Sequence, residues 1–283
     1  MSTPFPKGTG SQYAPASPRA GGTSRRDAPA SLMDRPSALP EGCVAPLVDL
    51  VTALADNKHA LGLRYAEWCS SGPTIEAGVA ATAMAQDELG HARVLYGLLE
   101  ELPGSPRRSE HEWSAADART VAFVERGFSD WPHLIVANLM LDRVLAAVLE
   151  TALDSRYLPL RQRARKIIEE ERYHAIHGQS WLVQLAAEGP GVRAELAAAL
   201  RDVWSDALCW FGPGDGGALG ALVDAGVLTA AGDAVRRRFL AQLAPVLTAA
   251  GVPAPLKAAG EHWELAEPLP WDRWDERARR VRR

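Results

Sequence analysis

Apolar side chains recur every three or four residues over most of the chain from residue 45 onward, which is the spacing of α-helices that bury one face. The first such stretch places Leu47, Leu50, Leu54 and Leu61 on a common side. Alternation of apolar and polar residues, which would indicate strands, is almost absent. The sequence therefore predicts an all-α protein.

Turn residues divide this pattern into separate helices. The first two expected helices flank Ser70-Ser71-Gly72-Pro73, where a glycine suited to a helix end meets a proline suited to a helix start. The expected helices span residues 47–68, 74–102, 131–153, 160–188, 192–210 and 234–250, and residues 212–220 are expected to form a flexible loop. Two long hairpins joined by a crossover are the layout of a ferritin-like four-helix bundle, here with accessory C-terminal helices.

The two ends of the chain differ in composition from this helical part. Residues 1–40 are rich in proline, glycine, serine and arginine and lack an apolar run, so they are expected to form a disordered arm. We assign residues 41–256 to the helical bundle and residues 257–283 to a C-terminal tail. The arginines of residues 277–283 are expected to be solvated.

Charge and cysteine content exclude several classes of function. The chain has 283 residues and a formal net charge of −4, which is too small to favour nucleic acid or an anionic membrane as the main partner. It contains no uncharged apolar run of the roughly 18 residues that a membrane span requires. Its three widely spaced cysteines provide no disulfide framework, which favours a reducing compartment, the cytoplasm.

The second helix of each expected hairpin carries one Glu-x-x-His motif. Glu88 and His91 form the first, and Glu171 and His174 form the second. A separation of three residues places both side chains of a motif on one helix face. Apolar residues on the preceding turns indicate that these faces point inward, and carboxylates with imidazoles suit iron or manganese. The pattern predicts a site for two metal ions, with a metal-free polar network as the alternative.

The other two helices are expected to complete this site. Asp142 shares a face with Asn138 and Leu145, and lies about level with Glu171 across the turn, so it is a third carboxylate candidate. The facing position of the first helix carries Lys58, where a further carboxylate would be expected. Its ammonium group could replace the charge of a metal, or a deprotonated Lys58 could act as a ligand or react with oxygen. Asp56 is the alternative ligand if this helix is rotated or kinked.

The residues LADNKHALGLRYAEWCSSGPTIEAGVAATAMAQDELGHARVLY resemble the first hairpin of the phenylacetic acid catabolic protein family. Residues 138–186 and 234–255 resemble the second hairpin and a late helix of the structural ferritin-like subunit of phenylacetyl-CoA epoxidase. In that family a catalytic subunit holds two irons, receives electrons from a reductase and inserts one oxygen atom of O₂ into the ring of phenylacetyl-CoA. A related subunit has lost metal ligands and acts as a scaffold.

The resemblance implies roles for particular residues. The positions that match ligands of the catalytic subunit are Glu88, His91, Asp142, Glu171 and His174. The sixth position, a glutamate in the catalytic subunit, corresponds to Lys58. We therefore expect either a di-iron oxygenase component with an acyl-CoA-type substrate and a reductase partner, or a non-catalytic subunit. Either is expected to assemble with copies of itself or with a related ferritin-like subunit.

Overall fold

The computed structural model describes residues 39–104, 109, 111, 113–114 and 116–282. The arm predicted for residues 1–40 lies outside these residues, except for its last two positions. The helices are α1 (Val44–Ala66), α2 (Ile75–Glu101), α3 (Ala122–Glu125), α4 (Trp131–Ala137), α5 (Arg143–Glu150), α6 (Leu158–Ala187), α7 (Pro190–Leu208), α8 (Gly217–Asp224) and α9 (Gly232–Ala250). The predicted all-α class is confirmed.

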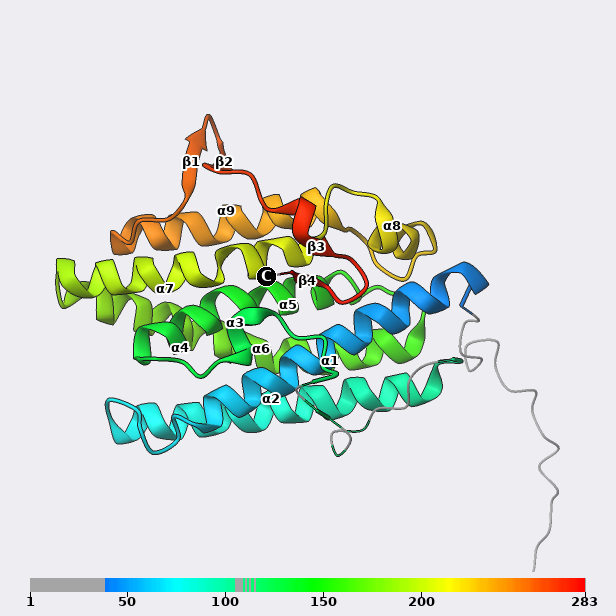
Figure 1. Ribbon diagram of the computed structural model, residues 1–283, viewed down its shortest axis with the longest axis horizontal. Coiled ribbons are helices and arrows are strands. Elements are labelled where there is room, and N and C mark those ends of the chain that lie inside the picture. The colour runs from blue at the N-terminus through cyan, green and yellow to red at the C-terminus, as the bar shows by residue number, and fades with distance from the viewer. Residues whose placement is uncertain (1–38, 105–108, 110, 112, 115, 283) are drawn as a thin grey trace, which may run out of the picture. The chain divides into compact units, whose positions relative to one another are not determined.

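Four helical segments form the bundle (Figure 1). Helices α1 and α2 make the first hairpin, and the Oγ1 atom of Thr74 caps α2 by accepting a hydrogen bond of 3.1 Å from the backbone of Ala77. Helices α4 and α5 are continuous through a π-helical turn, Asn138–Asp142, and act as one helix. With α6 they make the second hairpin. This is the ferritin-like arrangement that the sequence pattern predicts.

The segment Trp131–Glu150 is a long, apolar helix. By length and composition it could cross a membrane, but 89% of its most apolar window is buried inside the protein. Helices α7 and α9 cover its outer side, α7 against α4 and α9 against α5. The segment is thus the central helix of the packed core.

Helix α8 corrects the expectation of a flexible loop over residues 212–220. The helix begins at Gly217, inside the predicted loop. Its buried side chains Leu219 and Leu222 pack in the apolar core. Glycine lowers the helical propensity of this segment, and the burial of these two leucines favours the helix.

The last residues differ in part from the solvated tail that was expected, because Arg277 and Arg282 are exposed but Arg279 is buried. This segment forms two antiparallel strand pairs, β1 (Leu256–Ala259) with β2 (His262–Leu265) and β3 (Trp274–Asp275) with β4 (Arg280–Val281). Arg279 is only 2% exposed, and its guanidinium carbon lies 4.7 Å from the ring centre of Trp210 and 5.6 Å from that of Trp274. Its side chain also donates a hydrogen bond to the carbonyl of Trp210. Stacking on two indole rings offsets part of the loss of water around this charge, although burial still lowers the pKa of Arg279 to about 10.

The three cysteines, Cys43, Cys69 and Cys209, are all free thiols. The expectation that they form no disulfide framework is therefore confirmed.

Candidate functional site

Six ionisable side chains from the four bundle helices meet in the interior. They are Lys58 of α1, Glu88 and His91 of α2, Asp142 of the π-helical turn, and Glu171 and His174 of α6. Each is at most 1% exposed. We call this group the buried cluster. The sequence pattern pointed to all six.

Lys58 lies at the centre of the buried cluster. Its Nζ atom is 3.0 Å from Oε1 of Glu88 and 2.5 Å from Oδ1 of Asp142, and it also forms an ion pair with Glu171. These carboxylates come from three other segments of the bundle. One ammonium group thereby links all four bundle helices.

The π-helical turn positions Asp142. Its Oδ2 atom accepts hydrogen bonds from Nδ2 of Asn138 at 3.2 Å and from the Tyr65 hydroxyl at 3.4 Å. Helix α6 approaches this turn closely because Gly178 has no side chain, and a Cβ atom there would overlap Oδ1 of Asn138. An extra residue per turn is a common feature of helices at functional sites.

The two histidines are held in the same way, and their ring centres lie 6.2 Å apart. Nδ1 of His91 lies 3.3 Å from Glu88 and 3.4 Å from Glu171, and its Nε2 lies 2.8 Å from Glu170. Nδ1 of His174 lies 3.1 Å from Oδ2 of Asp142, while its Nε2 lies 3.3 Å from Asp87 on α2. Each histidine therefore faces the cluster with one nitrogen and a carboxylate of the opposite helix with the other.

Sequence reasoning did not assign a role to Asp87 or Glu170. Both side chains are about 40% exposed, so they connect the histidines to the surface. The sequence offered one indication of their role: each of these acids directly precedes the glutamate of a Glu-x-x-His motif.

The pKa values in the buried cluster follow from burial and the close charges. Burial by itself would lower the pKa of Lys58, but Asp142, Glu171 and Glu88 outweigh it and raise the pKa well above its usual value. Burial likewise opposes protonation of the histidines. Hydrogen bonds to the surrounding carboxylates nevertheless raise the pKa of His91 to about 9 and that of His174 to about 11. All three bases are therefore cationic at neutral pH.

The carboxylates divide into two kinds. For Glu88, burial would raise the pKa, but the charge of Lys58 and the histidine hydrogen bonds hold it well below its usual value. The pKa of Asp142 is also lowered. Burial and repulsion from Asp142 raise the pKa of Glu171 to about 7. Three positive groups therefore face the three buried acids, and the half-exposed Asp87 and Glu170 meet the histidines from outside the cluster.

Part of the buried cluster also has the composition of a metal site. Ligand atoms of Glu88, Asp142, Glu171 and His174 all lie within 4.8 Å of one another. The Oε2 atoms of Glu88 and Glu171 are buried and accept no hydrogen bond. These residues could hold a metal ion, although the ammonium group of Lys58 occupies the position between three of their carboxylates.

Asp56 lies outside the buried cluster. Its Oδ1 atom accepts a hydrogen bond of 2.7 Å from the Tyr96 hydroxyl, and its Oδ2 accepts one of 2.7 Å from the backbone of Arg119. Two residues along a helix correspond to a rotation of about 200°, so Asp56 and Lys58 point to nearly opposite sides of α1. Asp56 instead anchors the segment that leads into α3.

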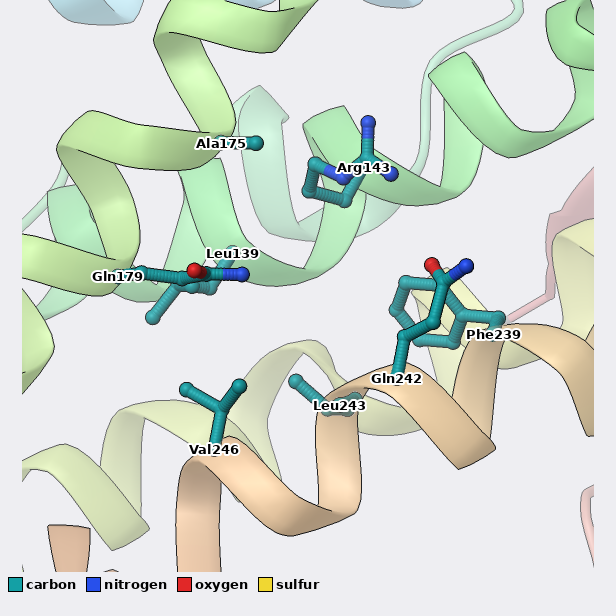
Figure 2. A pocket seen from close by; sticks show the side chains of 8 residues that line it. All are labelled: Leu139, Arg143, Ala175, Gln179, Phe239, Gln242, Leu243 and Val246. Carbon is teal, nitrogen blue, oxygen red and sulfur yellow. The ribbon is translucent and has the colours of Figure 1, made fainter. Parts of the chain in front are cut away.

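A cleft lies between α6, α9 and the π-helical turn. Leu243 and Val246 enter it from α9, and Gln179 of α6 lies opposite (Figure 2). Arg143 and Ala175, which also line it, directly follow Asp142 and His174 in the sequence. None of the six cluster side chains lines this cleft. The cleft therefore does not bring a ligand into contact with Lys58.

Comparison with known proteins agrees with this arrangement. The model of the family described as phenylacetic acid catabolic protein matches residues 31–273. No curated protein matches the chain. The family match spans the four bundle helices and every residue of the buried cluster. The chain thus belongs to the phenylacetic acid catabolic protein family.

Proposed function

We propose that the chain is a ferritin-like component of an oxygenase complex that acts in phenylacetate catabolism, and that it is the supporting subunit rather than the catalytic one. The observation that carries this proposal is the position of Lys58. Its ammonium group contacts Glu88, Asp142 and Glu171, the three carboxylates that would otherwise bind and bridge metal ions.

Charge balance supports this role. The three positive groups of the buried cluster already neutralise its acids, so two divalent ions would add a large positive charge to a dry interior. Histidine must be neutral to bind a metal, and the pKa values of about 9 and 11 mean that metal binding would have to displace protons from His91 and His174. The present side chains fit one ammonium group better than two iron ions.

In this role the residues of the buried cluster provide rigidity and not chemistry. Lys58 joins α1 to the other three segments of the bundle, and the bundle presents its outer faces to other subunits. A related metal-bearing ferritin-like subunit would hold the irons and an acyl-CoA-type substrate, and a reductase would supply electrons. We place this assembly in the cytoplasm.

A second candidate function is that of the oxygenase itself. It is favoured by the four closely spaced ligand residues and by the buried Oε2 atoms of Glu88 and Glu171, which accept no hydrogen bond. Bound iron would supply the capacity to bind and reduce O₂. Glu88, Asp142, Glu171 and His174 would hold it, and Lys58 would have to move away or lose its proton.

Metal analysis of the full chain purified from iron-replete cells separates the two functions. We expect little iron in the wild type and more in Lys58→Glu, because that substitution restores the carboxylate of the catalytic family members. Lys166→Glu is the matched control, since Lys166 is exposed on α6. Stoichiometric iron in the wild type would favour the oxygenase and contradict the supporting role.

A further inference from the structure

The cleft between α6, α9 and the π-helical turn has a buried apolar floor. Leu139 of the turn and Phe239 and Leu243 of α9 line it, and each of these side chains is at most 6% exposed. Ala175 of α6 also lines the cleft, and its short side chain leaves the space opposite Leu243 open (Figure 2). Protein interiors are close-packed, so an apolar cleft that opens at the surface is a candidate site for a small ligand.

Three polar side chains surround the mouth of this cleft. Gln179 of α6 and Gln242 of α9 are exposed, and Arg143 of α5 is partly exposed. Figure 2 shows Arg143 on the side of the cleft that is opposite Leu243. Amide and guanidinium groups both donate hydrogen bonds. The cleft therefore combines an apolar floor with N–H donors at its mouth.

The charge of Arg143 is only partly neutralised within the protein. Its Nη2 atom lies 3.5 Å from Oε1 of Glu150, which is longer than the usual N–H···O hydrogen bond. The other carboxylate oxygen of Glu150 lies 3.5 Å from Nη2 of Arg238. Two guanidinium groups thus share one carboxylate, and none of the described residues that line the cleft is acidic. The cleft therefore favours a ligand with a negative charge.

The size of the cleft limits this ligand. Its volume is about 70 Å³. A cavity of about 150 Å³ binds benzene, so this cleft has room for about three or four carbon atoms and not for an aromatic ring. We propose that the cleft binds a short aliphatic monocarboxylate, whose chain packs on the apolar floor and whose carboxylate meets Arg143. A planar guanidinium group can donate two parallel hydrogen bonds to one carboxylate.

Such a ligand would join helix α9 to the segments that carry the buried cluster. Leu139 lies in the π-helical turn that ends at Asp142, and Ala175 directly follows His174. A ligand that binds the folded chain alone stabilises it, so the carboxylate should raise the melting temperature. The ligand would not touch the cluster itself, because no cluster side chain lines the cleft. The inference therefore does not rest on the proposed function.

Titration of the ¹⁵N-labelled full chain with sodium butyrate, followed by NMR, tests the proposal. A ligand of this size is expected to bind with a Kd of about 0.1–1 mM. The shifted resonances should belong to residues 139–143, 175–179 and 239–246. Butyramide has the same chain without the charge, and it should bind at least about tenfold more weakly. Benzoate should also bind more weakly than butyrate, because its ring exceeds the volume of the cleft.

Two variants separate the effect of the charge from that of the space. Arg143→Met should weaken butyrate binding at least about tenfold and should leave butyramide binding nearly unchanged. Ala175→Leu should abolish the binding of both compounds, because the larger side chain would fill the cleft. Arg201→Met removes the same charge at an exposed position of α7 and is the control, which should bind butyrate like the wild type. Melting curves identify any variant that fails to fold.

Several results would overturn the proposal, and two of them require only the wild type. These two are the absence of saturable butyrate binding below about 10 mM and an equal or higher affinity for butyramide or benzoate. Unchanged butyrate binding in folded Arg143→Met or Ala175→Leu would contradict the assigned location. None of these results depends on the iron content that tests the proposed function.

Discussion

The Nζ atom of Lys58 lies 2.5 Å from Oδ1 of Asp142, and the two residues hold equivalent places in the two hairpins. Lys58 precedes Glu88 by 30 residues, and Asp142 precedes Glu171 by 29. The bundle thus repeats one arrangement of helix, turn and Glu-x-x-His motif. In the first hairpin a cation, Lys58, stands where the second hairpin has a carboxylate, Asp142. The attraction between these two charges joins the two halves of the bundle.

The first prediction concerns the stability that Lys58 provides. Lys58→Met leaves three buried acids without their central cation, which should cost on the order of 3–5 kcal/mol. Without Lys58, the folded-state pKa values of these acids should rise above their unfolded values, so the stability of the variant should fall further as pH rises from about 5 to 8. Urea denaturation at several pH values measures both effects. Lys166→Met is the exposed control, and an equal loss there would show that charge removal alone explains the result.

Asp56 allows a test of which α1 residue belongs to the site. Asp56→Asn removes charge from a carboxylate that accepts two hydrogen bonds at 2.7 Å, which should cost about 1–3 kcal/mol. It should not alter iron uptake when combined with Lys58→Glu, because Asp56 points away from the buried cluster. Iron content and urea midpoints of the single and double variants give the answer. Loss of iron from the double variant would make Asp56 a ligand.

His177 should make the protein sensitive to acid. Burial and the nearby charge of His174 lower the pKa of His177 to about 4, and neither of its ring nitrogens has a hydrogen-bond partner in the structure. The unfolded chain takes up this proton near pH 6.5 while the folded chain resists it, so stability contributed by neutral His177 is lost as pH falls from about 6.5 to 4.

The loss due to His177 should be about 1–2 kcal/mol, because the ring is partly exposed and solvent weakens the effect. His177→Gln should flatten the stability curve over this pH range relative to wild type. Identical slopes for the two proteins between pH 6.5 and 4 would contradict the assignment.

Arg279 should stabilise the packing of the C-terminal segment. Arg279→Ala removes a buried guanidinium that lies over Trp210 and Trp274, and this should cost about 2–4 kcal/mol. Tryptophan fluorescence should report the same change, since both indole rings lose their shared neighbour. Arg282→Ala, at an exposed position, should remain within about 0.5 kcal/mol of wild type. Equal effects of the two substitutions would show that Arg279 acts only through net charge.

The fold was predictable because its determinants are local. Helix spacing, the Thr74 cap and the turn at residues 70–73 are encoded in short stretches of sequence, and the structure reproduces the helices to within a few residues. Helix α8 and the C-terminal strands were not predicted. The interactions that stabilise these segments are the burial of Leu219 and Leu222 and the stacking of Arg279 on Trp210. Both depend on residues far away in the chain.

The same division applies to the site. The sequence by itself determined which side chains point inward, because helical periodicity assigns each residue to a face, and it identified Lys58 as the residue that differs from the expected carboxylate. Only the tertiary structure decided that Lys58 contacts three carboxylates at once, that Asp56 binds elsewhere, and that Asp87 and Glu170 hold the opposite histidines. The physical reason is that periodicity sets direction around one helix axis, whereas distances between helices depend on their packing, including the π-helical turn and the close approach at Gly178.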